Sequence, residues 1–354
     1  MKFLVFVSAL LLIISCKKEE AAVNNPTQDF NTSDMLNSFA INVAEPTYAG
    51  LNDYASALYT SMQAFAKDTA EANLTLCRSN WKNARKYYEQ SESFLFGPVS
   101  TDNIDPKIDT WPIAYTRLDS MINSRSGFPA SFVDSLPDEL KGFHPIEYLL
   151  FGKNGNKKTT EFTAKELTYL VSVSLNLKTL AQQLQDSWNT QKTDNFYWQF
   201  VSAGNGSTAY KTSLSAINEL ISKMAGICEE VAGGKMFDPF SQKDPSLEES
   251  PFANVSLGDF QNNIQGVENV YLGKFAKDGI GLEDFVRKYN LSLDANIKSK
   301  IGIAKTSLGN ITLPFGQAIT QQSVQVQNAM NAISDLQQVL SKDLFNLAQQ
   351  HLKN

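Results

Sequence analysis

Histidine is scarce in this sequence, which has only His144 and His351 among its 354 residues. His351 stands close to the C-terminus, where chains are often poorly ordered. Imidazole is the usual titrating group near neutral pH and a common metal ligand. Any such site would therefore depend on His144, and sites built from several histidines are excluded.

Cysteine is equally sparse, with three residues in the chain. Cys16 belongs to an N-terminal signal discussed below, which leaves Cys77 and Cys228 in helical sequence patterns. Neither has a second cysteine at CxxC spacing, which argues against a zinc–thiolate site. The two thiols are expected either to form one disulfide in an oxidising envelope or to stay buried and free.

Positive charge and long hydrophobic runs are also limited. Lys and Arg number 31 against 37 Asp and Glu, which gives a formal net charge of −6. Without a basic patch to displace counterions, the chain is not expected to bind nucleic acid. The main apolar run, from Phe3 to Ile14, is shorter than the roughly 20 residues that cross a bilayer.

The N-terminus has the features of an export signal, with Lys2 before the apolar run and Ser15 before Cys16. A cysteine directly after Leu-Ile-Ile-Ser resembles the lipobox of bacterial lipoproteins. It implies removal of residues 1–15 and lipidation of Cys16, with an ordinary signal peptide as the alternative. We therefore expect a lipid anchor in the bacterial cell envelope, at the outer membrane, facing the periplasm or the cell surface. The polar residues 16–32 are expected to form a flexible tether.

From Ser33 onward, apolar residues recur with a period near 3.6, so the expected fold class is all-α. One helix is predicted from Met35 to Phe65, kinked at Pro46. The others are predicted over 70–96, 110–123, 138–151, 164–189, 207–232, 257–273, 282–309 and 315–350. The longest loop is predicted from Gly233 to Val255. A break near residue 190 predicts two packed bundles of four principal helices, over 33–190 and 195–354, and allows a distant duplication.

Two charged residues interrupt the apolar stripe of the predicted helix 70–96. Arg85 and Glu92 share a face with Trp81 and Tyr88, at spacings of four and seven residues. Because burying an unpaired ion is costly, both side chains must be paired or face a wet cavity. An ion pair that bridges helices is favoured over a ligand-facing pair, since structural ion pairs are common.

His144 stands in Gly142-Phe143-His144-Pro145-Ile146-Glu147, for which two local structures are open. If Pro145 is the first helical residue, Glu147 reaches back to the backbone as part of a helix cap. If the helix begins near Pro137 and bends at Pro145, His144 and Glu147 share one face. In that second arrangement they can share a divalent cation with carboxylates from elsewhere.

Helix capping is a simple explanation for some of the other polar residues. Asp109 is expected to cap the helix that follows it, with a position facing His144 as the alternative. Ser256 and Asp259 fit the N-cap and N3 positions of the predicted helix 257–273. Glu249 and Asn254, in the loop before that helix, fit no capping pattern.

Together these segments resemble the imelysin family, including its imelysin-like envelope lipoproteins. The matching segments are Trp81-Lys82-Asn83-Ala84-Arg85, Glu92-Ser93-Phe94-Leu95-Phe96-Gly97-Pro98, Ile108-Asp109-Thr110-Trp111-Pro112, the GxHxxE motif from Gly142 to Glu147, and Glu249-Ser250-Pro251-Phe252 with Leu257-Gly258-Asp259-Phe260. They occur in order through nearly all of the mature chain. One departure is at Ala253 and Val255, where many relatives are more polar.

The resemblance implies two helical bundles with the motif residues gathered in a cleft between them. It implies that His144 and Glu147 are metal ligands. The remaining motif residues are expected to contact the ligand: Arg85, Glu92, Asp109, Glu249 and Asn254. The family is associated both with metallopeptidase activity and with bacterial iron uptake.

The residue inventory favours binding over hydrolysis. A zinc peptidase needs three protein ligands, a position for water and a general base. Here one histidine is available, and Glu147 cannot easily be both ligand and base. Carboxylates with one imidazole suit iron or another hard-to-borderline ion. We therefore expect a divalent or trivalent metal ion, iron or an iron-containing ligand, bound during uptake with a receptor or permease as partner.

Two alternatives remain open at this point. One is an imelysin-type metallopeptidase in which Glu147 is the base and a metal-bound water is the nucleophile. The other is a module that binds an organic ligand without a metal, through Arg85 and the aromatic residues around it.

Overall fold

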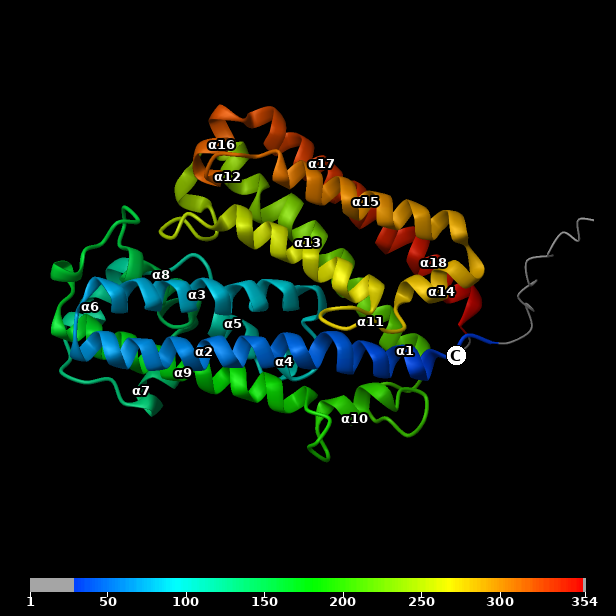
Figure 1. Cartoon of the computed structure of the whole chain (residues 1–354), viewed down its shortest axis with the longest axis horizontal. Coiled ribbons are helices and arrows are strands. Elements are labelled where there is room, and N and C mark those ends of the chain that lie inside the picture. Colours follow the sequence, from blue (N-terminus) through cyan, green and yellow to red (C-terminus); the bar gives the residue numbers. More distant parts are fainter. Residues whose placement is uncertain (1–28, 353–354) are drawn as a thin grey trace, which may run out of the picture. The chain divides into compact units, whose positions relative to one another are not determined.

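Helices and their connections make up residues 29–352, the part of the chain that the computed structural model describes (Figure 1). No strand occurs among these residues, so the all-α prediction is confirmed. None of the helices in this range has the length and apolar composition needed to cross a membrane. The predicted signal peptide, Cys16 and most of the predicted tether lie outside the described residues.

The first predicted helix consists of α1 (Thr32–Phe39), a π-helical turn (Ala40–Ala44) and α2 (Glu45–Lys67). Pro46 lacks the N–H that would bond the carbonyl of Asn42, four residues earlier. The π-helical turn accommodates the proline, and the Asn42 carbonyl instead accepts the N–H of Phe275 at 3.2 Å. The irregularity at Pro46 is therefore a change of helix type that ties the first helix to a distant loop.

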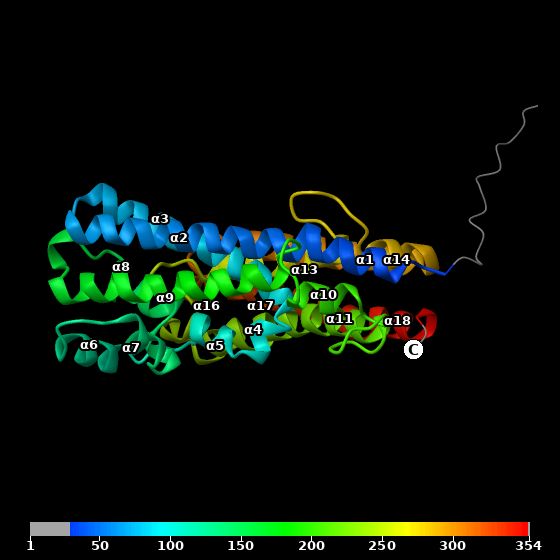
Figure 2. The same cartoon turned by 90° about the horizontal axis from the view of Figure 1, so that it is seen from below.

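Two long helices pack along α2, as Figures 1 and 2 show. They are α3 (Glu71–Ser91), which continues as a 3-10 turn (Glu92–Phe94), and α9 (Ala164–Trp188). The predicted helices 70–96 and 164–189 are thus confirmed. Fully buried apolar residues of the three helices include Leu51, Leu58, Phe65, Leu74, Trp81, Val173 and Leu184.

Cys77 lies in α3 and Cys228 in α11 (Ser213–Glu230), and both carry free, buried thiols. Of the two alternatives left open by the sequence, the structure therefore contains the pair of free thiols. Burial raises the pKa of the Cys77 thiol to about 11, so this group stays protonated at neutral pH.

Short helices connect α3 to α9. They are α4 (Pro98–Thr101), α5 (Ile104–Asp109), α6 (Tyr115–Asn123), α7 (Ala130–Asp134), a 3-10 turn (Asp138–Leu140), α8 (Phe143–Phe151) and a 3-10 turn (Thr159–Glu161). The prediction of a helix starting at residue 110 is wrong. Residues 110–114 are not helical, and Pro112 disfavours the helical conformation of Trp111 before it. The Trp111–Pro112 peptide bond is cis. Asp109 is therefore the last residue of α5 and does not cap a following helix.

Gly142 determines where α8 begins. It adopts a φ of 85°, which separates the 3-10 turn from α8, so the predicted helix 138–151 is two elements. A Cβ atom at residue 142 would lie 2.2 Å from the carbonyl oxygen of Ile108 in α5. Glycine thus lets the start of α8 approach the end of α5, and this approach brings His144 next to Asp109.

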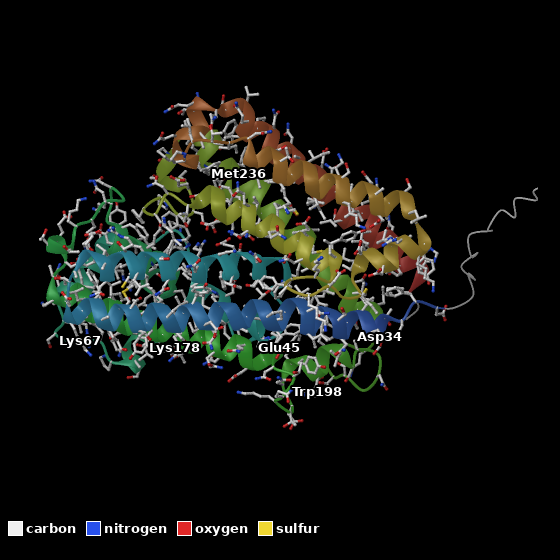
Figure 3. All side chains as sticks on the ribbon, in the orientation of Figure 1. Asp34, Glu45, Lys67, Lys178, Trp198 and Met236 are labelled. Atoms are coloured by element: carbon white, nitrogen blue, oxygen red, sulfur yellow. The ribbon has the colours of Figure 1, made fainter. Side chains whose placement is uncertain are left out.

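The chain after α9 contains α10 (Phe196–Val201), which the sequence pattern missed, and then α11. A π-helical turn (Val231–Lys235), α12 (Phe237–Gln242) and a 3-10 turn (Pro245–Leu247) lead to α13 (Ser256–Leu272). The predicted loop from Gly233 to Val255 is wrong in its first half. The chain stays helical around Met236, labelled in Figure 3, because this side chain is fully buried. The predicted boundary near residue 190 and the distant duplication stay predictions.

The last part of the chain contains α14 (Leu282–Tyr289), α15 (Leu291–Gly309), α16 (Phe315–Gln321), α17 (Ser323–Gln338), a π-helical turn (Val339–Leu344) and α18 (Phe345–His351). The predicted helix 282–309 breaks at Asn290, whose side chain accepts the N–H of Leu293 at 2.9 Å and starts α15. The predicted helix 315–350 breaks between α16 and α17. α15 packs against α13 and α17. The ring of His351 stacks on Tyr289, with centroids 4.1 Å apart.

α13 approaches α3 closely at Gly266. A Cβ atom at residue 266 would lie 2.2 Å from the backbone oxygen of Gln90 in α3. One turn earlier, the Asn263 side chain donates to the carbonyl of Glu89 at 3.0 Å. This crossing joins segments far apart in the sequence beside a cluster of buried charges.

Gly266→Ala is expected to destabilise the fold by about 1–3 kcal/mol, the usual cost of overpacking, because a backbone oxygen cannot move aside freely. Gly258 serves as the control in the same helix, since no heavy atom lies within 4 Å of a Cβ built there. Gly258→Ala should stabilise the protein by up to about 1 kcal/mol through helix propensity. Urea unfolding followed by circular dichroism compares the two, and equal effects would contradict the close crossing.

Candidate functional site

Arg85, in α3, is fully buried and surrounded by four carboxylates. Its Nη2 atom pairs with Glu89 at 2.5 Å and with Glu249 at 3.0 Å, and its Nε atom lies 3.4 Å from Asp259. The fourth partner, Asp109, contacts Nη1. These carboxylates come from α3, from the loop before α13, from α13 and from the end of α5. One guanidinium therefore joins four segments of the chain.

Trp81, one turn before Arg85, fixes α8 against α3. Its indole N–H donates to the carbonyl of Phe143 at 3.0 Å. The Phe143 ring in turn lies 5.5 Å from the Arg85 guanidinium. Together with the close approach at Gly142, these contacts set the start of α8, and so the position of His144, beside Arg85.

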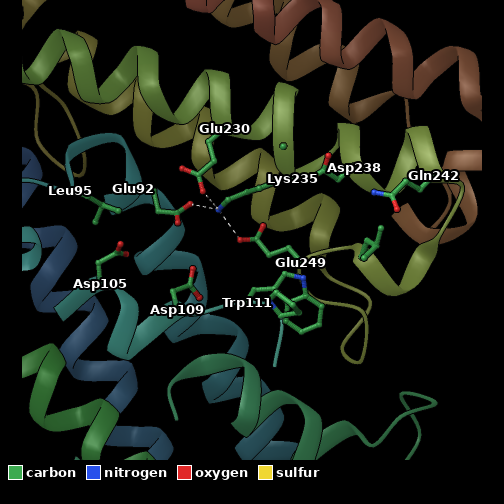
Figure 4. Close-up of a pocket in the computed structure, with 13 residues that line it drawn as sticks. Glu92, Leu95, Asp105, Asp109, Trp111, Glu230, Lys235, Asp238, Gln242 and Glu249 are labelled. Atoms are coloured by element: carbon green, nitrogen blue, oxygen red, sulfur yellow. Dashed lines mark hydrogen bonds and ion pairs between the residues drawn. The ribbon is translucent and has the colours of Figure 1, made fainter. Parts of the chain in front are cut away.

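Lys235 is the second cation of the cluster (Figure 4). Its Nζ atom lies 2.7 Å from Glu92 and 2.7 Å from Glu249. Glu89 and Glu230 are more distant, at 3.9 Å and 4.0 Å. Lys235 ends the π-helical turn after α11, which brings its ammonium to the charged face of α3. Glu249 is therefore shared by both cations.

The buried ring of His144 has a carboxylate on each side. Its Nδ1 atom lies 3.4 Å from Oε2 of Glu147, whose Oε1 accepts the N–H of Ala253 at 2.7 Å. Its Nε2 atom lies 3.2 Å from Oδ1 of Asp109. Glu147 thus faces one edge of the ring, and Asp109 faces the other.

Neither local structure considered for the His144 motif is correct in full. α8 begins at Phe143, so Pro145 is not its first residue, and Glu147 bonds a distant loop instead of the backbone of its own helix. A helix that starts near Pro137 is also wrong. The shared face of His144 and Glu147 is nevertheless present. The contact from the loop uses the backbone N–H of residue 253, so it does not depend on the apolar side chain there.

Carboxylates outnumber cations in this cluster. The buried or nearly buried carboxylates are Glu89, Glu92, Asp109, Glu147, Glu249 and Asp259. Arg85 and Lys235 are the permanent cations that pair with them. Burial raises the pKa of Glu92 to about 8 and that of Asp259 to about 6, despite the opposing effect of the two cations. The excess negative charge thus favours proton uptake or another cation.

Asp109 and His144 form the part of the cluster that favours charge. Burial alone would raise the pKa of Asp109, but Arg85 and His144 hold it below its usual range. Burial and the charge of Arg85 disfavour protonation of His144, yet the carboxylates of Asp109 and Glu147 outweigh them and raise its pKa. The Asp109 carboxylate is therefore ionised at neutral pH and available as a ligand.

Two sets of side chains have the geometry to hold a metal ion. Ligand atoms of Asp109, His144 and Glu249 lie within 4.8 Å of one another, and so do those of Glu89, Glu249 and Asp259. In the first set, Oε2 of Glu249 is buried without a hydrogen-bond partner among the described residues, and Nε2 of His144 faces Oδ1 of Asp109. Oxygen and imidazole donors suit iron and similar borderline ions.

A pocket of about 430 Å³ opens beside this first set (Figure 4). Asp109, Glu249 and Lys235 line it, together with Glu92, Leu95, Asp105, Trp111, Pro112, Glu230, Gly234, Asp238, Gln242 and Leu247. Two of the three candidate ligands, Asp109 and Glu249, therefore border a space large enough for a small ligand or a hydrated ion.

Most of the residues singled out from the sequence lie together in this cluster: Arg85, Glu92, Asp109, His144, Glu147 and Glu249. Asn254 does not join them. It is exposed, has a φ of 53°, and its side-chain nitrogen faces Gly155. The left-handed turn at Asn254 instead helps to shape the loop that carries Glu249 and Ala253.

Three residues of the cluster were missed by sequence reasoning. Glu89 follows Arg85 by four residues, a spacing that places both on one helix face and could have indicated the pair. Lys235 fell within the predicted loop, so no periodicity marked it. Asp259 was assigned to helix capping.

The capping assignment for Ser256 and Asp259 is wrong. α13 begins at Ser256 itself, whose hydroxyl donates to Glu248 at 2.9 Å. Asp259 accepts the hydroxyl of Ser250 at 2.6 Å and pairs with Arg85. The tertiary ion pair therefore replaces the local capping interaction.

Arg85→Met is expected to destabilise the protein by about 3–5 kcal/mol, because it leaves buried carboxylates without their main counter-charge. Arg78→Met is the matched control in the same helix, since Arg78 donates to the carbonyls of Leu150 and Lys157 at 2.8 Å and 2.6 Å. It should cost less, about 1–2 kcal/mol. Adding Glu89→Gln to Arg85→Met should recover part of the loss. Urea unfolding measures all three, and an Arg85→Met protein as stable as wild type would contradict this account.

Comparisons with known proteins agree with the motif pattern and the fold. The sequence model of the imelysin family matches residues 44–342. The chain is 29% identical over 329 residues to iron-regulated protein A of Synechococcus elongatus, with coverage of 91% of this chain and 88% of that protein.

Two crystal structures have similar folds. One is a protein described as an iron-regulated protein A precursor from Parabacteroides distasonis, with a TM-score of 0.81, 22% identity, and coverage of 92% of this chain and 97% of that one. The other is an imelysin-like protein from Psychrobacter arcticum, with a TM-score of 0.75, 13% identity, and coverage of 91% and 97%. Because the family's sequence model matches most of the chain, this protein belongs to the imelysin family.

Proposed function

We propose that this protein binds a divalent or trivalent metal cation, with iron as the first candidate, through Asp109, His144 and Glu249. One observation carries the proposal. Ligand atoms of Asp109, His144 and Glu249 converge within 4.8 Å of one another, Nε2 of His144 lies 3.2 Å from Oδ1 of Asp109, and Oε2 of Glu249 is buried with no hydrogen-bond partner among the described residues. Buried polar atoms usually have partners, so an unpartnered carboxylate oxygen beside two converging ligand groups is typical of a binding site.

Glu147 has a positioning role in this proposal. It faces Nδ1 of His144, on the opposite edge of the ring from Nε2. Carboxylates that bond the far nitrogen of a ligating histidine fix its tautomer and its orientation. Of the two ligands expected from the motif, His144 thus keeps its role, while Glu147 supports it and Asp109 and Glu249 provide the oxygen donors.

The surroundings of Glu147 favour binding over peptide hydrolysis. A general base must reach the water that it activates. Both oxygens of Glu147 are engaged, one by the N–H of Ala253 and the other by His144, and the residue is fully buried. This arrangement suits a site that holds a cation.

Iron is the proposed ion for two reasons. The Synechococcus relative is named iron-regulated protein A. One imidazole with two carboxylates also matches the mixed donor preference of iron. With a lipid anchor at Cys16, the protein would hold the ion at the outer membrane, within reach of an uptake receptor or permease. The anchor and the transport partner are parts of this proposal.

His144→Ala is expected to weaken metal binding at least tenfold, because it removes the one nitrogen donor of the site. His351→Ala is the matched control. His351 lies in α18, stacks on Tyr289 of α14 and is not part of the cluster. Calorimetric titration with ferrous ion under anaerobic conditions, and with zinc as a redox-inert ion, measures both. Equal affinities for wild type and His144→Ala would refute the site.

Glu147→Gln separates binding from hydrolysis. A glutamine that keeps the hydrogen bond from Ala253 turns its amide N–H toward Nδ1 of His144. The ring proton must then move to Nε2, which blocks the proposed ligand atom. We expect metal affinity to fall about 10–100-fold while the fold is retained. Unchanged metal affinity with loss of chelator-sensitive cleavage of a protein substrate would instead support the peptidase alternative.

A further inference from the structure

The ammonium of Lys235 lies among carboxylates in the way that a bound cation does. It is 2.7 Å from both Glu92 and Glu249, with Glu89 at 3.9 Å and Glu230 at 4.0 Å. An ammonium has three donors and no acceptor, so it serves these groups as a point charge. Its side chain is 11% exposed and borders the pocket.

Lys235 and the proposed metal ion depend on the same carboxylate. Oε1 of Glu249 pairs with both Lys235 and Arg85, while Oε2 is buried with no hydrogen-bond partner in residues 29–352. A cation bound at Asp109, His144 and Glu249 therefore repels the ammonium and draws the Glu249 carboxylate away from it. The two cations compete for Glu249.

The pocket wall is strongly acidic. Carboxylates on the wall belong to Glu92, Asp105, Asp109, Glu230, Asp238 and Glu249. Among the described residues that line the pocket, Lys235 is the one with a positive charge. Such a wall repels an anionic chelate and attracts a free cation. The volume of about 430 Å³ leaves room for water molecules around the ion.

A second carboxylate, that of Glu230, is within reach of the Lys235 side chain. Lys235 ends a π-helical turn, a feature that is frequent at functional sites. Gly233 and Gly234, in the same turn, have no heavy atom within 4 Å of a Cβ built on them. Glu230 lies on the outer side with a side chain that is 60% exposed, so it can receive the ammonium when Glu249 is taken.

We propose that the pocket takes its ligand as a hydrated divalent cation, and that Lys235 is a tethered counter-cation which this ion displaces from Glu249. The inference rests on the proposed metal site. It assigns Lys235 as the residue that sets the affinity of that site. It also specifies the class of ligand, because the acidic pocket wall repels an anionic chelate.

The first test is a calorimetric titration of the protein with zinc. Lys235→Met should bind zinc about tenfold more tightly than wild type, because the competing charge is gone, whereas Lys235→Arg should stay within about threefold. Lys223→Met is the matched control. Lys223 lines the neighbouring pocket that shares Glu92, Leu95, Asp105 and Glu230. A general effect of charge would change both Met variants alike, whereas displacement predicts a gain for Lys235→Met alone.

The outcomes separate the inference from the proposed function. If wild type does not bind zinc, or His144→Ala binds it equally, the metal site itself fails. If wild type binds zinc through His144 but a folded Lys235→Met binds it no more tightly, or gains no more than Lys223→Met, the displacement is overturned. Ferric citrate, an intact anionic chelate, tests the class of ligand. If it binds more tightly than the free ions, the acidic wall does not select free cations.

A second measurement uses the wild-type protein and does not depend on the folding of a variant. Lysines are labelled by reductive methylation with and without saturating zinc, and mass spectrometry compares Lys235 with Lys223. Displacement predicts at least a threefold rise in labelling at Lys235, with Lys223 unchanged. Unchanged or slower labelling at Lys235 overturns the proposal.

Discussion

The buried guanidinium of Arg85 is the interaction on which the rest of the site depends. Taking an ion out of water costs several kcal/mol, and here the cost is offset by carboxylates from four segments of the chain. None of these segments can move without leaving a charge unpaired. The cluster therefore fixes α5, the loop before α13 and α13 relative to α3. Of the two roles considered for Arg85 from the sequence, the helix-bridging ion pair is present, and it also forms the wall behind the candidate ligands.

That cluster can form only because the backbone comes close at two glycines. Gly142 allows α8 to meet α5, and Gly266 allows α13 to meet α3, since a Cβ atom at either position would fall 2.2 Å from a carbonyl oxygen. The first approach sets the distance between His144 and Asp109, and the second sets the distance between the carboxylates of α3 and those near α13. The apolar contact of Trp81 with Phe143 keeps the first approach in register. Packing thus positions the charges, and the charges then hold the packed elements together.

The sequence predicted the fold class and the main helices because their apolar period extends over many residues. It also singled out Arg85 and Glu92 as charges on an apolar stripe, His144 as the one interior histidine, and Glu249 as a residue that fits no capping pattern. It could not predict which partners they meet. Asp259 satisfied a local capping pattern, yet its carboxylate pairs with Arg85, 174 residues away. Lys235 lay in a stretch of glycines with no apolar period, so its helical conformation depends on burial of Met236. Asn254 was grouped with Glu249 by proximity in sequence, but a left-handed turn directs the two side chains to different places.

The balance of charge in the cluster bears on whether it is purely structural. An ion-pair network that only stabilises a fold gains most when its charges are matched, because each unpaired buried carboxylate weakens the fold. Here several carboxylates surround two permanent cations, and burial with mutual repulsion raises the pKa of Glu92 to about 8. Such an excess is costly for the fold alone but useful for a site that must accept a cation. Arg85 neutralises the innermost carboxylates and cannot leave, whereas Lys235 reaches the cluster from the pocket wall on a flexible chain. In the proposed mechanism, the first cation would stabilise the site without a ligand, and the second would limit how tightly an incoming ion is held.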